Sequence, residues 1–293
     1  MYLARMRERC QQSDIQGGMT DPDREPTIWP SGVAHLIEEA RADVDELLAN
    51  GRIRRAVELR VHTGVDFDPT YFPMYFTGAF ESRFVLVHLN PKLSSRLVGA
   101  RYADFDAYFD VHRRFGYHHW GRDPSYRSAF DHKQVRFLRQ FGVIDFVPGT
   151  DRDSRRKNAA LAIDAKLQLE LVPYGSPTFP THLFTADLLR PHFDRVLGVV
   201  VAYPRDYVVF CGAVFDDLLD RAGVIVSRHE HRFRLPTREG TSRSEYRFSN
   251  VVIDYGGARF HAGVARSFAI QGLPMSEYGW KCHELYHAGN ETP

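Results

Sequence analysis

A continuous run of apolar residues, from Arg83 to Leu89 (RFVLVHL), constrains the fold more than any other segment of this sequence. Turn residues bound the run, and this pattern is typical of a strand buried on both faces, as in a parallel sheet. Asn90-Pro91 ends the run abruptly. The sequence therefore predicts a buried central strand with a sharp end.

Helical and strand patterns alternate along the rest of the chain. Two further apolar segments, Gln168–Val172 and Asp206–Cys211, predict strands. Helical spacing predicts helices over Ser31–Asn50, Asp104–Phe115, Asp131–Gln140, Asp153–Leu167, His182–Leu197, the residues after Gly212 up to Leu219, and Ser276–Tyr286. This alternation indicates an α/β fold. We expect a three-layer α/β/α sandwich with a mainly parallel central sheet.

The two ends of the chain have their own patterns. Residues 1–30 are polar and rich in Gly and Pro, which predicts a flexible leader. Short strands are expected near the C-terminus, at 224–226, 232–234, 246–248, 251–255 and 259–262. We expect one domain over 31–293, with an N-terminal helical extension and an insertion after the first strand at about 99–142.

Composition excludes several classes of protein. Lys and Arg total 38 against 37 Asp and Glu, so the net charge of +1 excludes a uniformly basic nucleic-acid binder and leaves room for a local basic patch. The three cysteines are widely spaced, which argues against a disulfide framework and for a cytoplasmic protein. No apolar run approaches the roughly 20 residues of a membrane span, so no membrane partner is expected.

Ligands of open α/β sheets bind beyond the carboxyl ends of the strands. Four segments of this sequence are expected to lie there: Asn90-Pro91-Lys92, 170–177, Gly212-Ala213 and 267–279.

These segments carry a resemblance to the uracil-DNA glycosylase superfamily. Residues 86–91 (LVHLNP) look like that family's first motif, a strand ending in Asn-Pro. Residues 170–173 (ELVP) and 208–213 (VVFCGA) are similar to its second and third strand ends. Residues 271–278 (QGLPMSEY) are similar to its late His-Pro-Ser-Pro-Leu-Ser loop. The resemblance covers about residues 70–285 and implies a uracil-DNA-glycosylase-like fold.

The resemblance also implies roles for single residues. Asn90 would position a water against the glycosidic carbon, Glu170 would read the base, and Gln271 would stabilise the leaving base. Met275 stands where an apolar wedge enters the DNA stack. The residues expected around the substrate are His88, Pro91, Lys92, Glu170, Pro173, Tyr174, Gly212, Ser267, Pro274, Met275 and Ser276.

Two departures from the family pattern bear on the substrate. Glu170 stands where the family usually has Asn, and an ionised Glu only accepts hydrogen bonds, which favours cytosine or guanine over uracil. Gln271 replaces a His and carries no charge, so we expect reduced or altered activity. Each position also has a plainer interpretation: Asn90 as a turn former, Glu170 in an ion pair or on a solvated face, Met275 in the core, and Lys92 on the surface.

Basic residues gather in two stretches. The first, between Ser227 and Arg247, interleaves arginine with aromatic residues, which suits phosphate contact and base stacking or else a solvated hairpin. Its candidate nucleic-acid-binding residues are Arg228, Arg232, Arg234, Arg243 and Arg247. The second runs from His112 to Arg139 and either covers the mouth of the site or packs as an insertion.

A competing motif lies near the C-terminus. His283-Glu284-Leu285-Tyr286-His287 matches HExxH, which on a helix can bind zinc. Six residues follow it, so a third ligand would have to come from upstream.

We therefore expect a divergent uracil-DNA-glycosylase-like protein that hydrolyses an N-glycosidic bond in nucleic acid, DNA before RNA, or in a nucleotide, without a cofactor. Two alternatives remain open: a non-catalytic nucleic-acid-binding module of the same fold, and a zinc hydrolase using His283 and His287.

Overall fold

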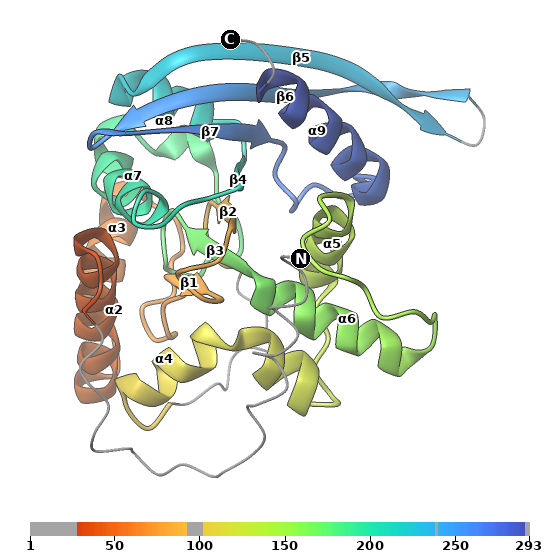
Figure 1. Ribbon diagram of the computed structural model, residues 1–293. Coiled ribbons are helices and arrows are strands. Elements are labelled where there is room, and N and C mark those ends of the chain that lie inside the picture. The colour runs from red at the N-terminus through yellow and green to blue at the C-terminus, as the bar shows by residue number, and fades with distance from the viewer. Residues whose placement is uncertain (1–27, 93–101, 238–239, 291–293) are drawn as a thin grey trace.

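The computed structural model describes residues 28–92, 102–237 and 240–290, without the side chains of 237, 241–243 and 290. Its centre is a seven-stranded sheet in the order β1-β3-β2-β4-β7-β6-β5 (Figure 1). The strands are β1 Phe76–Thr77, β2 Phe84–His88, β3 Lys166–Glu170, β4 Tyr207–Cys211, β5 Ile225–Thr237, β6 Gly240–Tyr255 and β7 Ala258–Ala265. Most of the expected leader, residues 1–27, and the start of the expected insertion lie outside the described residues.

The sheet is mixed, so the expectation of a mainly parallel sheet is wrong. Strand β2 pairs in parallel with β3 and with β4, and β4 pairs in parallel with β7. The other three pairings, β1 with β3, β6 with β7 and β5 with β6, are antiparallel. The fold is α/β, and its four parallel strands end along one edge of the sheet.

Helices occupy most of the expected segments. They are α2 Ser31–Asn50, α3 Arg54–Thr63, α4 Phe105–Arg113, α5 Ala129–Gln140, α6 Arg152–Ala165, α7 Ala186–Val200, α8 Val214–Ala222 and α9 Met275–Asn290, with a π-helix η1 at Gly116–Arg122 and a 3-10 turn η2 at Thr181–Leu183. The range of α2 was predicted correctly, and the helix begins after Pro30 without a side-chain cap. Both α3 and β1 were missed, and β3 begins two residues earlier than expected.

Two apolar cores lie on opposite faces of the sheet. On one face, Val85 and Val87 of β2 join residues of α2, α7 and α8. On the other face, Phe84 and Leu86 join residues of α5 and α9. Figure 1 shows these two sets of helices on either side of the strands. The alternation explains why the whole β2 run is apolar: both faces of the strand are covered.

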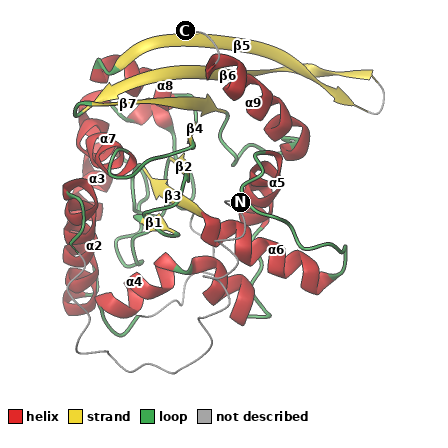
Figure 2. Ribbon diagram, viewed as in Figure 1, coloured by secondary structure: helices red, strands yellow, loops and turns green. Residues whose placement is uncertain are grey.

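Strands β5 and β6 form a long hairpin where several short strands were expected. Only Ser249–Tyr255 of β6 pairs with β7, so the first part of β6 pairs with β5 alone. Figure 2 shows this part as an arm that extends past α9. The ring of Tyr278 on α9 packs against Phe233 and Tyr246 of the arm, which holds the arm to the body.

The N-terminal helix α2 is joined to the sheet by a buried carboxylate. Asp43 is 1% exposed and accepts hydrogen bonds from the hydroxyls of Tyr75 at 2.5 Å and Tyr174 at 2.9 Å. The Arg55 guanidinium donates to the same carboxylate at 2.9 Å. Burial raises the pKa of Asp43, and these partners oppose the shift. Since Tyr174 follows β3, α2 supports the segment beyond that strand.

Within the described residues, no helix is long and apolar enough to cross a membrane.

Helices α2 and α7 cross at two glycines, which yields a stability prediction. A Cβ atom on Gly32 would lie 2.2 Å from the backbone oxygen of Gly198, whereas one on Gly198 would have no neighbour closer than 3.5 Å. We expect Gly32→Ala to lower the free energy of unfolding by about 1–3 kcal/mol, because overpacking forces the helices apart. Gly198→Ala, the matched control, should be neutral or stabilising by up to about 1 kcal/mol, because Ala favours helix.

Urea denaturation of the two variants measures both values. Equal effects at the two positions would contradict the close approach of α2 and α7.

Candidate functional site

A row of buried polar side chains lies on one face of β3. Lys166, Gln168 and Glu170 alternate with apolar residues and are 0%, 5% and 2% exposed. The Lys166 ammonium donates to Gln168 Oε1 at 2.5 Å, and Gln168 Nε2 donates to Glu170 Oε1 at 2.6 Å. This chain leads from the start of the strand to its carboxyl end.

Two further polar side chains meet the row at the end of β3. His88 lies opposite Glu170 in the β2–β3 register, and Gln134 comes from α5 above the sheet. Four atoms, His88 Nε2, Glu170 Oε2 and both polar atoms of the Gln134 amide, have no hydrogen-bond partner among the described residues. The Gln134 amide lies near enough to affect the pKa of His88 but does not complete a hydrogen bond to Nε2. We call these five residues, His88, Gln134, Lys166, Gln168 and Glu170, the strand-end cluster.

Burial sets the protonation states of the cluster. Desolvation raises the pKa of Glu170 to about 8, against the opposing effects of Gln168 and Lys166. Burial also lowers the pKa of His88 to about 3 and that of Lys166 to about 8. At neutral pH the Glu170 side chain is therefore a neutral acid that can donate as well as accept. The expectation that Glu170 only accepts, and so disfavours uracil, is corrected.

Asn90 connects the ends of β2 and β3. Its Nδ2 donates to Ser176 Oγ at 2.8 Å, to Pro91 O at 3.1 Å and to Tyr174 O at 3.3 Å. The amide thus holds the segment after β3 against the end of β2. No described residue donates to its Oδ1, which leaves that oxygen as an acceptor.

The other expected residues at the first two strand ends shape this edge. Pro91, Pro173 and Tyr174 are buried, and Lys92 is exposed, with its backbone bridged to that of Ser176. Gly212, at the end of β4, donates its N–H to Ala265 O at 2.9 Å. The segments 90–92, 170–177 and 212–213 therefore lie together, as expected.

The loop after β7 reaches the cluster at one residue. The ring of Phe268 lies 5.3 Å from that of His88, whose other neighbour is Phe130 at 5.0 Å. Lys133 on α5 donates to the carbonyls of Phe268 and Ile270 at 2.7 and 2.9 Å, which ties the loop to that helix.

The late motif does not take its expected place. Gln271 is exposed, and no described contact joins it to Asn90 or Glu170. Met275 is 2% exposed in the core around Tyr278, so it is not an exposed wedge. Ser267, Pro274 and Ser276 are half-buried around the same turn. The apolar packing of α9 decides this, because Met275 is the first residue of that helix.

Three members of the cluster, Gln134, Lys166 and Gln168, were missed in the sequence. The signal for two of them was present: Lys166, Gln168 and Glu170 recur at a spacing of two residues, which places them on one face of a strand. Extending the preceding helix to Leu167 hid this alternation. Nothing in the sequence near Gln134 indicates that it faces β3.

The arginines of the hairpin are largely neutralised by carboxylates. Arg228 pairs with Asp220 and Asp216, and Arg247 pairs with Asp216 and Glu230. Arg232 pairs with Glu230 and Glu245. Arg234 is exposed, and the side chain of Arg243 lies outside the described residues. The hairpin is therefore a network of ion pairs more than a free basic surface.

The HExxH motif lies on α9 as expected. His283 and His287 approach each other at 2.9 Å between their Nε2 atoms, and His287 Nε2 is 3.0 Å from the Tyr207 hydroxyl. Among the described residues, no group of three or more His, Cys, Asp or Glu side chains is arranged to hold a metal ion. The third zinc ligand that this motif needs is not supplied by them.

Comparison of the sequence with family models and curated proteins, and of the structure with solved structures, gave no match.

The pKa of Glu170 predicts how stability depends on pH. The folded-state pKa of about 8 exceeds the ordinary value of 4.5, so the folded state binds this proton more tightly than the unfolded chain does. The stability from the neutral acid is fully present below about pH 4.5 and is lost as the pH rises through about 8. Relative to Glu170→Gln, which stays neutral, the wild-type protein should therefore lose stability between pH 5 and pH 9.

Urea denaturation at several pH values tests this, with the exposed Glu38→Gln as a matched control that should show no such trend. A difference between wild type and Glu170→Gln that stays constant with pH would contradict the assignment of a neutral Glu170.

Proposed function

We propose that this protein hydrolyses the N-glycosidic bond of a nucleotide, with the base bound at the strand-end cluster. The observation that supports this most directly is the set of four buried polar atoms of His88, Gln134 and Glu170 that have no partner among the described residues. Leaving such an atom unpaired costs about 1–3 kcal/mol. A ligand with several donors and acceptors on one flat edge would remove this cost, and a nucleobase has that chemistry.

The charges of the cluster suit departure of a base. Glu170 as a neutral acid can both donate to and accept from a base edge, so uracil is compatible with it. The positive charge of Lys166 acts through Gln168 and Glu170 on the negative charge that develops on the leaving base. This assigns to Lys166 the electrostatic role that the resemblance implied for Gln271.

Asn90 is proposed to position the attacking water. Its Nδ2 is held by Ser176 and Tyr174, so the amide is fixed and its Oδ1 is oriented to accept a hydrogen bond. A neutral amide orients a water without deprotonating it. This suits a reaction in which the bond to the base breaks before the water attacks.

Because His88 and Glu170 are nearly fully buried, a base reaches them only when the Phe130 or Phe268 ring turns aside.

The likeness to the uracil-DNA glycosylase superfamily is part of this proposal. Four parallel strand ends along one edge support it, and the first two expected motifs are in direct contact, because Leu171 N donates to His88 O and Val172 N to Leu89 O, both at 2.8 Å. The non-catalytic nucleic-acid-binding module remains the competing function and would show binding without product.

An assay of base release tests the proposal. Single- and double-stranded DNA and RNA containing uracil, hypoxanthine, xanthine or normal bases, and the corresponding free nucleotides, are incubated with the full chain. Abasic sites are detected by strand cleavage, and the base released from free nucleotides is detected by chromatography. We expect Lys166→Met, which removes the charge, and Glu170→Ala, which removes the donor and acceptor, to lower the rate by about 10²–10³-fold, in the range seen on removing one electrostatic stabiliser.

Glu38→Gln is again the control. Full activity of Asn90→Ala would refute the role of that residue alone, and no base release from any of these substrates would refute the proposed function.

A further inference from the structure

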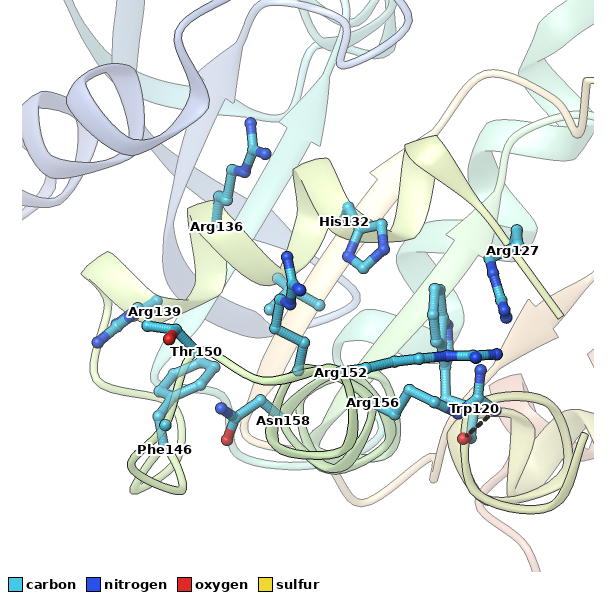
Figure 3. A pocket seen from close by; sticks show the side chains of 13 residues that line it. Trp120, Arg127, His132, Arg136, Arg139, Phe146, Thr150, Arg152, Arg156 and Asn158 are labelled. Carbon is cyan, nitrogen blue, oxygen red and sulfur yellow. Dashed lines mark hydrogen bonds between the residues drawn. The ribbon is translucent and has the colours of Figure 1, made fainter. Parts of the chain in front are cut away.

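A hollow of about 580 Å³ lies between α5 and α6, away from the strand-end cluster, and its lining is strongly basic. Its arginines are Arg127, Arg136, Arg139, Arg152, Arg155 and Arg156. Figure 3 shows the labelled arginines on the two helices that border the hollow: Arg136 and Arg139 on α5, and Arg152 and Arg156 on α6. A volume of this size is typical of a small-ligand pocket.

None of these six arginines forms an ion pair with a carboxylate in the part of the chain that the structure describes. Two of the carboxylates near them in sequence are engaged elsewhere. Asp131 accepts from Trp120 Nε1 at 2.8 Å and from the Tyr126 hydroxyl at 3.1 Å, and Asp151 caps the start of α6. The positive charge of the hollow is therefore not neutralised by ion pairs among the described residues, in contrast to the paired arginines of the hairpin.

The arginines divide into anchored and available ones. Arg156 donates to the carbonyls of Trp120 at 2.5 Å and Asp123 at 2.6 Å, and Arg127 and Arg152 both donate to Pro124 O. These bonds fix three guanidinium groups along one wall. Arg136 and Arg139 are exposed and donate to no described group, and Arg139 lies over the Phe146 ring at 5.3 Å. The available groups can thus close on a ligand that the fixed wall orients.

The pKa of a histidine in the lining shows the effect of these arginine charges. His132 has a lowered pKa, first because of burial, and the charges of Arg136, Arg155 and Arg127 lower it further against the opposing effect of Asp131. Three arginines from α5, α6 and the segment before α5 therefore act on one imidazole. Like charges held this close repel one another, so an anion in the hollow would be bound favourably.

We propose that this hollow, lined by the six arginines, is a binding site for a ligand with several phosphate groups. Guanidinium groups match phosphate oxygens in pairs, and several around one hollow favour a polyanion over a single carboxylate. The ligand is either the backbone of a nucleic acid strand or a free polyphosphate chain, which present the same chemistry. None of these residues belongs to the strand-end cluster, so this site stands independently of the proposed hydrolysis.

Binding to two probes tests the site. A fluorescent single-stranded DNA 12-mer of normal bases and inorganic tripolyphosphate are titrated against the full chain, by anisotropy and by calorimetry, from about 50 to 200 mM salt. The variant Arg136→Gln/Arg139→Gln is compared with Arg52→Gln/Arg259→Gln. The control loses the same charge from two exposed arginines that are likewise outside any described ion pair.

If the ligand is a nucleic acid, we expect Arg136→Gln/Arg139→Gln to weaken binding of the 12-mer by roughly tenfold. The control, Arg52→Gln/Arg259→Gln, should change it less than twofold. The slope of log K against log salt should become shallower by about 1 to 2, since each lost phosphate contact releases one counterion fewer. Binding of tripolyphosphate alone, with the same dependence on Arg136 and Arg139, would support the site and identify its ligand as a free polyphosphate.

The inference is overturned if neither probe binds at 50 mM salt. It is also overturned if Arg136→Gln/Arg139→Gln and the control variant weaken binding equally. Thermal unfolding of each variant checks that it is folded. Should the double variant unfold, the single variants Arg136→Gln and Arg155→Gln, at exposed helix positions, carry the same comparison.

Discussion

The parallel pairing of β2 with both β3 and β4 is the interaction on which the rest of the structure depends. The peptide groups of β2 are buried, so they must hydrogen-bond to neighbouring strands. The side chains of β2 must also be covered on both faces of the sheet. Parallel neighbours require long crossovers, which the chain supplies with α4 to α6 between β2 and β3 and with α7 between β3 and β4. The carboxyl ends of the strands then lie together, which places His88 and Asn90 beside the segment after β3.

Burial that stabilises the sheet also makes the strand-end cluster costly. Four unpaired polar atoms at about 1–3 kcal/mol each amount to a large part of the 5–15 kcal/mol that holds a typical domain folded. The fold lowers the electrostatic part of this cost by keeping Glu170 and His88 neutral and by satisfying Lys166 through Gln168. Buried polar groups without partners are costly, so their presence at the strand-end cluster is a reason to propose a ligand there. This is why Glu170, in place of an expected Asn, is compatible with base recognition.

Arginines have opposite significance in two parts of this molecule. In the β5–β6 hairpin they pair with glutamates of the hairpin and with aspartates of α8. Between α5 and α6 they line a hollow and form no ion pair with any carboxylate that the structure describes. The net charge of +1 is a sum over the whole chain, so it does not distinguish the paired arginines of the hairpin from those that line the hollow. Pairing, which depends on what the fold brings within reach, decides which basic stretch is free to bind an anion.

Much of the fold could be predicted from local patterns in the sequence. The apolar run of β2 and the helical spacing of α2 both act within a few residues, so they are visible without the tertiary structure. The candidate site at the strand ends could be placed because parallel strands must end on one edge. The antiparallel half of the sheet was misjudged, because short patterns in 225–255 do not reveal that two long strands pair with each other.

The sequence by itself determined that Asn90, Glu170 and their strands are brought together, since strand polarity and burial follow from residue type. Only the tertiary structure decided that Gln134 and Lys166 join them, that Met275 is buried, and that the arginines of α5 meet those of α6. These outcomes depend on contacts between segments far apart in the chain. The protonation of Glu170 belongs with them, because its pKa is set by burial against other elements and not by its neighbours in sequence.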